Sequence, residues 1–213
     1  MHRMSRRRAV LVLCARQPED EDLEGLKEVR AIQETLAQHR QRNPLAEIDY
    51  ELRICTSMEE VRDYVRRIRA PIDLDDDEAD EPSLPIAVVH VITHANAKSS
   101  TFYLDEDVKW SELATLFGAG DVCPEGVHYW MACCNGWQRK GSHLVDAAKN
   151  ATLPQSLLAW TIPSENEPNI SVTRIYYDEL LREATSDLAH RVLQRASSST
   201  VVAGLKAWPV PTQ

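Results

Sequence analysis

Short apolar runs alternate with amphipathic stretches along most of the chain. Residues 8–15, 86–93, 127–133 and 156–160 are runs of strand length in which most side chains are apolar. Such runs are typical of strands that are buried on both faces of a parallel sheet. Residues 47–54 instead alternate polar and apolar side chains, which predicts a strand near an edge of the sheet with one face in water.

Apolar residues recur at helical spacing between these runs. Leu23, Leu26, Val29, Ile32 and Leu36 predict an amphipathic helix of about four turns. Ser57 followed by Glu60 has the spacing of a capping box at the start of a second helix. The pattern also predicts a hairpin near 101–108, helices over 111–117, 141–150, 171–184 and 186–196, and a last strand over 201–208. Strands that alternate with helices indicate an α/β sandwich with a mostly parallel sheet.

Length and composition fit one compact domain over residues 1–213. The chain has 213 residues, of which 43% are hydrophobic, enough for a full core. Residues 1–7 form a basic tail, 73–85 an acidic and proline-containing segment that predicts a flexible loop, and 209–213 a terminal tail.

Charge and cysteine usage exclude several classes of protein. The net charge of −9 disfavours a nucleic-acid groove, which needs clustered lysine and arginine. No apolar stretch approaches the roughly 20 residues that span a bilayer, and the basic start lacks a cleavage site for secretion. Five cysteines at irregular spacing do not predict a disulfide framework, so we expect a cytoplasmic protein without membrane contact, in which Cys14 and Cys55 are packing residues.

Two of the apolar runs end in reactive side chains. The run from Ile86 leads to His94, and the run from Val127 leads to Cys133 and Cys134. The carboxyl ends of neighbouring parallel strands meet at one edge of a sheet, where ligands bind in open α/β folds. A thiol beside an imidazole is the minimal arrangement for a cysteine nucleophile with its base.

These segments resemble CHAT-type peptidases of the caspase-like cysteine peptidase clan, most closely the bacterial members. His90-Val-Ile-Thr-His94-Ala95 is similar to the family's His-x-x-x-His-Gly segment, and Trp130-Met-Ala-Cys-Cys-Asn-Gly136 is similar to its nucleophile segment. Residues 102–113 resemble the hairpin and helix that lie between them in the family. The resemblance spans roughly residues 8–196 and implies a caspase-like three-layer α/β/α sandwich.

The family implies a cysteine endopeptidase that needs no cofactor. His94 would be the base and Cys133 the nucleophile, with Cys134 as the alternative nucleophile. Backbone N–H groups of Ala95 and Cys133 would hold the oxyanion. Ala95 stands where the family usually has glycine, which puts the oxyanion geometry in question.

Other roles follow less directly from the sequence. His90 lies an even number of positions before His94, so it either orients the site from behind the catalytic residues or is a buried histidine bonded to a neighbour. Asp20, Asp22 and Met131 could line a substrate pocket, and the two acids could equally be solvated. The expected partners are a protein substrate and an activating protease or regulatory protein, as in bacterial effectors of stress or antiviral defence. The acidic loop is a candidate processing or docking segment.

Three other interpretations stay open. His90, His94, Cys133 and Cys134 could bind zinc, although their spacing is not that of usual zinc sites. The chain could be an inactive peptidase-like binding module, or a different cysteine hydrolase or acyltransferase. No nucleotide-binding motif is present in the sequence.

Overall fold

A six-stranded sheet forms the centre of the molecule. The computed structural model describes residues 6–15, 23–70, 83–93, 95–96, 101–118, 120–133, 155–161, 166–183, 185–199 and 204–208. The strand order is β2-β1-β3-β7-β8-β9, in which only β9 runs antiparallel to its neighbour. The strands are β1 (Arg6–Cys14), β2 (Ile48–Cys55), β3 (Ile86–Ile92), β7 (Val127–Met131), β8 (Gln155–Trp160) and β9 (Leu205–Trp208).

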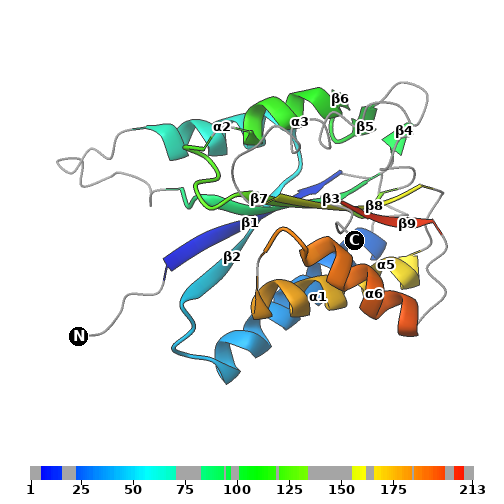
Figure 1. Ribbon diagram of the computed structural model, residues 1–213. Coiled ribbons are helices and arrows are strands. Elements are labelled where there is room, and N and C mark those ends of the chain that lie inside the picture. Colours follow the sequence, from blue (N-terminus) through cyan, green and yellow to red (C-terminus); the bar gives the residue numbers. More distant parts are fainter. Residues whose placement is uncertain are drawn as a thin grey trace.

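Helices cover both faces of this sheet, which gives the three-layer α/β/α sandwich expected from the sequence (Figure 1). The upper layer in Figure 1 contains α2 (Met58–Arg69), α3 (Trp110–Phe117) and a small antiparallel sheet of β4 (Ala95–Asn96), β5 (Thr101–Tyr103) and β6 (Asp107–Lys109). The lower layer contains α1 (Leu23–Arg42), α5 (Asn166–Arg182) and α6 (Leu188–Ser199).

Alternate residues of each central strand belong to different hydrophobic clusters. In β3, Val89 and Val91 pack in the upper cluster with α2 and α3, whereas Val88 packs in the lower cluster with α1, α5 and α6. The side chains in both clusters are almost completely buried. Burial on both faces explains why these strands are continuous apolar runs in the sequence.

The order of the parallel strands is that of a doubly wound, flavodoxin-like sheet. Starting from β1, the chain first adds β2 on one side and then crosses to add β3, β7 and β8 on the other. Helix α1 joins β1 to the parallel strand β2 and runs antiparallel to both, and α5 leads back from the carboxyl end of β8, so both helices end at the edge where the parallel strands begin. This placement brings the last turns of two helices to the amino edge of the sheet.

Most predicted elements are confirmed, with differences at their ends. The basic tail is shorter than expected, because Arg6 and Arg7 already belong to β1, and Arg6 and Arg8 bind Glu125 at 2.9 and 2.5 Å. Ser57 caps α2 as predicted, accepting from the Glu60 N–H at 3.2 Å.

Residues 83–85, the end of the predicted loop over 73–85, form no helix or strand, and the Tyr64 hydroxyl donates to the Leu84 carbonyl at 3.0 Å. Residues 71–82 and the predicted helix over 141–150 lie outside the described residues. The prediction of a single domain stays a prediction. Within the described residues, no helix combines the length and apolar character that crossing a membrane requires.

Gly25 lets the first turn of α1 approach the sheet closely. A Cβ atom at this position would lie 3.3 Å from Cys14 Sγ at the end of β1 and 3.7 Å from Ile92 Cγ2 at the end of β3. A side chain larger than a methyl group would therefore overlap the ends of two central strands.

We predict that Gly25→Val lowers the free energy of unfolding by about 1–3 kcal/mol, the usual cost of overpacking a core contact. Lys27→Val is the matched control, because Lys27 is exposed on the same turn and valine has the same low helix propensity there. Urea denaturation measures both variants. Equal stability of the two variants would contradict the close approach.

Candidate functional site

The structure buries the predicted nucleophile in the upper core. Cys133 follows β7, and its side chain is 1% exposed in the cluster formed with α2 and α3. Met131, predicted to line a substrate pocket, is fully buried in the same cluster. A nucleophile and a pocket residue both have to meet a substrate, and neither side chain reaches the surface.

His90 lies on the opposite face of the sheet from Cys133. In the β3–β7 register His90 is paired with Trp130, and the two rings are 5.9 Å apart in the lower layer. Val91 is paired with Met131, and both side chains lie in the upper cluster. Cys133 follows Met131 by two residues and lies in the same cluster. The sheet therefore separates His90 from Cys133, so His90 cannot orient that thiol and one metal ion cannot bind both.

Several predicted site residues lie outside the described residues. They are His94, Cys134, Asp20 and Asp22. Ala95 is described only as part of β4, where it pairs with Phe102. Among the described residues there is no group of three or more histidine, cysteine or acidic side chains that could hold a metal ion.

A buried polar network occupies the lower layer around His90. Its Nε2 atom lies 3.0 Å from Glu28 Oε1, and its Nδ1 atom lies 3.0 Å from the Tyr177 hydroxyl. Thr173 donates to the same Glu28 oxygen and accepts from Trp130 Nε1 at 2.7 Å. His90 is thus the buried, hydrogen-bonded histidine that was one of its two sequence interpretations.

The Tyr177 hydroxyl stays a proton-bearing member of this network. Burial raises the pKa of Tyr177 well above its usual range, so the hydroxyl beside His90 Nδ1 keeps its proton. The network ties α1 and α5 to the central strands β3 and β7.

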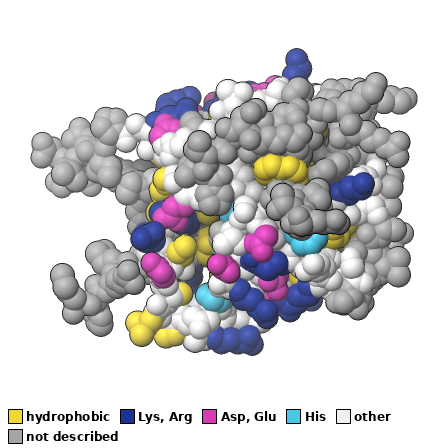
Figure 2. Space-filling model, viewed as in Figure 1, with side chains coloured by type: hydrophobic (Ala, Val, Ile, Leu, Met, Phe, Trp, Pro, Cys, Tyr) yellow, Lys and Arg dark blue, Asp and Glu magenta, His cyan; other side chains and the backbone are white. Residues whose placement is uncertain are grey.

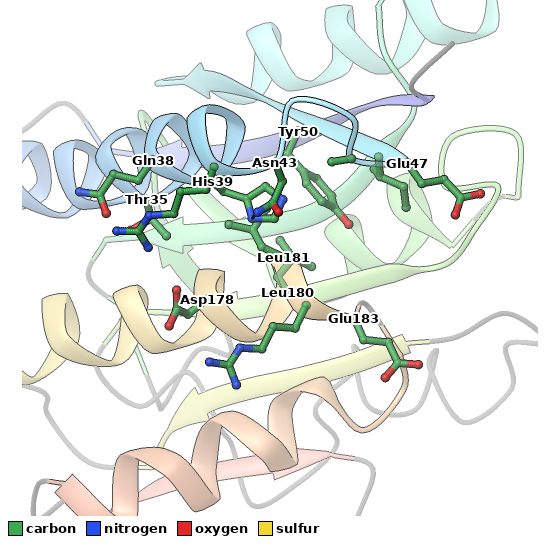
Figure 3. A pocket seen from close by; sticks show the side chains of 14 residues that line it. Thr35, Gln38, His39, Asn43, Glu47, Tyr50, Asp178, Leu180, Leu181 and Glu183 are labelled. Carbon is green, nitrogen blue, oxygen red and sulfur yellow. Dashed lines mark hydrogen bonds between the residues drawn. The ribbon is translucent and has the colours of Figure 1, made fainter. Parts of the chain in front are cut away.

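A cavity among the described residues lies at the amino edge of the sheet, between the ends of α1 and α5 and the start of β2. Its volume is about 730 Å³. Figure 3 shows His39 and Asn43 on one side and Asp178 and Glu183 on the other, with Leu181 between them. We call this cavity the helix-end pocket. Its lining residues are Thr35, Gln38, His39, Arg42, Asn43, Ala46, Glu47, Ile48, Tyr50, Asp178, Leu180, Leu181, Arg182 and Glu183.

Local contacts fix the α1 side of the pocket. The Asn43 N–H donates to the His39 carbonyl at 2.8 Å, and the Ala46 N–H donates to the Asn43 carbonyl at 3.0 Å, which turns the chain sharply from α1 into β2. Arg40 then joins the helix to the strand by donating to Asp49 at 3.0 Å and to the Tyr50 carbonyl at 3.1 Å.

Both acidic and basic side chains line the pocket, and only some of them form ion pairs with neighbouring residues. Asp178 is paired with Arg195 at 2.9 Å, whereas Arg42 and Glu183 have no ion pair within the part of the chain that the structure describes. Arg182 is 3.6 Å from Glu179, a carboxylate that also binds Arg195 at 3.0 Å. The two guanidinium groups of Arg42 and Arg182 are therefore the charges most available to a ligand.

Sequence reasoning missed the helix-end pocket. The residues that α1 and β2 contribute to the pocket are about 140 positions away from those of α5, so no local sequence motif contains both sets. The only signal is the basic residues in the last turns of α1 and α5, which the helix dipole also favours. Figure 2 shows basic, acidic and histidine side chains gathered over the lower part of the molecule.

Comparisons with known proteins give little further information. No family model matches the chain, and no curated protein matches it. A solved structure that is similar is the NAD(P)H:quinone oxidoreductase from Methanothermobacter marburgensis, with 14% identity and a TM-score of 0.32, covering 83% of this chain and 99% of that one. At this TM-score the likeness carries no argument for the activity of this chain.

The prediction of a caspase-like cysteine peptidase is corrected. The proposed nucleophile Cys133 is buried in the upper core, and the sheet separates it from His90. We therefore do not retain the protease function or the catalytic roles that depended on it. The comparisons do not test the motif resemblance itself, which stays a prediction.

We predict that Glu28→Ala lowers the free energy of unfolding by about 3 kcal/mol, because it leaves buried donors of Thr173 and His90 without their acceptor. Glu34→Ala is the control on the same helix. The Glu34 side chain is 51% exposed and 3.7 Å from Arg174, so its loss is expected to cost less than about 0.5 kcal/mol. Urea denaturation distinguishes the two, and equal effects would show that the network adds nothing to stability.

We also predict that the buried thiols react slowly in the folded protein. Burial raises the pKa of Cys55 and of Cys123 to about 12, so both stay protonated at pH 8. Iodoacetamide labelling, mapped by mass spectrometry, is expected to be slow at Cys55, Cys123 and Cys133 until urea unfolds the chain. Faster native labelling of Cys133 than of the other two would argue for an accessible, activated thiol.

The same shifts give a pH dependence of stability. The unfolded thiols lose their protons near pH 9.0 and the folded ones near 12, so the folded state binds more protons in this interval. The stability that Cys55 and Cys123 contribute is complete below pH 9.0 and decreases as the pH rises above it. Alanine variants at both positions are expected to show a weaker alkaline loss of stability in urea denaturation at increasing pH.

Proposed function

We propose that this chain is a ligand-binding domain that takes a small anionic molecule with an apolar part in the helix-end pocket. The observation that carries this proposal is a cavity of about 730 Å³ that combines two available guanidinium groups with an apolar floor. Small-molecule sites in proteins usually have volumes of roughly 300–1,000 Å³ and a few polar groups that fix orientation.

The charge of the pocket supports an anionic group on the ligand. Arg42 lines the cavity without an ion pair among the described residues, and Arg182 shares the Glu179 carboxylate, 3.6 Å away, with Arg195, whereas Asp178 is already paired. A guanidinium group binds a carboxylate or phosphate through two parallel hydrogen bonds. Glu183 carries the remaining charge without an ion pair among the described residues, and it would disfavour ligands of high negative charge.

The floor of the pocket supports an apolar part. Ile48 and Tyr50 come from β2, and Leu180 and Leu181 come from α5. In Figure 3 the two leucines lie between the polar side chains of the two helices. A ring or short alkyl chain could cover these side chains while its anionic group meets the arginines.

The carboxyl edge of the sheet is less suited to the same ligand. Doubly wound sheets commonly bind phosphate groups there, on a glycine-rich turn that leads into the first helix. In this sequence the corresponding segment is Arg16-Gln-Pro-Glu-Asp-Glu-Asp22, which has four carboxylates and no glycine. Its charge would repel a phosphate or a carboxylate.

Isothermal titration with phenylphosphate and inorganic phosphate tests the proposal. We expect phenylphosphate to bind more tightly than phosphate, because only the phenyl ring covers the apolar floor. Arg42→Gln and Arg182→Gln are each expected to weaken phenylphosphate binding by about tenfold, the loss of roughly one charge-assisted hydrogen bond.

Arg66→Gln serves as the control for the loss of one arginine. Arg66 lies on α2 in the opposite layer and is 75% exposed beside Asp63. Its substitution should leave binding unchanged. Undetectable binding of both probes, or binding that all three substitutions leave equally strong, would refute the proposed site.

A further inference from the structure

Strand β2 is a long edge of the central sheet, and it is largely open within the part of the chain that the structure describes. It has eight residues, contains no proline and pairs only with β1 among the described residues. Exposed edges of this kind offer unpaired backbone groups to a further strand, and natural proteins usually protect them.

The direction of its backbone groups follows from the pairing with β1. The Glu47 carbonyl accepts from the Arg6 N–H, so residues 47, 49, 51 and 53 direct their backbone groups toward β1. Ile48, Tyr50, Leu52 and Ile54 then direct theirs outward. Within the described residues one side-chain contact covers this row, from Arg40 to the Tyr50 carbonyl at 3.1 Å.

The side chains of β2 are complementary to a second copy of the same strand. In an antiparallel pair with its twofold axis at Leu52, outward backbone groups face outward backbone groups, so the two Leu52 residues form a hydrogen-bonded pair. Glu51 then lies opposite Arg53 of the second copy, and the reverse pair forms across the axis. Cross-strand pairs of opposite charge stabilise a sheet.

The same register also covers an exposed apolar side chain. Ile54 is 46% exposed at the end of β2. The pairing places it opposite Tyr50 of the second copy, on the face of the sheet that packs against α1. Aromatic residues and β-branched residues form favourable cross-strand pairs.

We infer that two copies of this chain associate through antiparallel pairing of their β2 strands, which joins the two central sheets into one continuous sheet. The interface is isologous, since each contact occurs twice about the twofold axis. This inference does not depend on the ligand proposed for the helix-end pocket.

Sedimentation velocity on the full chain over a range of concentrations tests the inference. The wild type is expected to show a species with twice the mass of the chain. Glu51→Lys and Arg53→Glu each place like charges opposite one another twice in the dimer, and each is expected to raise the dissociation constant by about tenfold or more.

A mixture of the two variants gives the sharpest result. In a mixed dimer the introduced lysine of the Glu51→Lys copy faces the introduced glutamate of the Arg53→Glu copy. The unchanged Arg53 of the first copy faces the unchanged Glu51 of the second, so both pairs have opposite charges again. Equimolar mixing should therefore restore the dimer that each variant loses alone. Thermal unfolding checks that both variants fold, because Glu51 also binds Arg7 at 2.8 Å and Arg53 at 3.4 Å within its own chain.

Asp107→Lys and Lys109→Glu are the matched controls for charge. Both residues are exposed on β6, in the opposite layer, and they repeat the two kinds of charge reversal away from β2. Both controls should dimerise like the wild type. A monomeric wild type at every concentration, or single variants that dimerise as well as the controls, would overturn the inference.

Discussion

The lower half of this molecule depends on one buried carboxylate. Glu28 and His90 are 3% and 0% exposed. They contact each other between the central strand β3 and the helices α1 and α5. A buried ionised group is costly unless hydrogen bonds satisfy it, and Thr173 and His90 both contact the same oxygen. The need to keep this carboxylate paired fixes the positions of α1 and α5 relative to β3.

The helix-end pocket is a consequence of this constraint. Because α1 and α5 are held side by side on the lower face, their last turns reach the amino edge of the sheet together. Helices end there with basic residues for electrostatic reasons. Where two such ends meet above the apolar start of β2, they produce a cavity with charged walls and an apolar floor. The proposed ligand site thus arises from packing and requires no special local motif.

Most of the architecture could be predicted from the sequence because each element carries its own pattern. The apolar run 86–93 and the spaced apolar residues of 23–36 correctly identify a buried strand and a helix. The site could not be predicted in this way, since the period of a strand relates residues within that strand only. Whether His90 shares a face with Cys133 depends on the register of β3 against β7, and this register places the two on opposite faces.

The most direct test of the central constraint is native-state hydrogen exchange of the wild type and of Glu28→Gln, an isosteric change that removes the charge. The account predicts that the backbone amides of α1 and α5 lose protection together in the Glu28→Gln variant, because the buried carboxylate holds the two helices in place. The loss should include amides near Leu36 and Leu180. The amides of α2 should keep the protection that they have in the wild type. Unchanged protection of α1 and α5 in the variant, or an equal loss of protection in α2, would contradict the account.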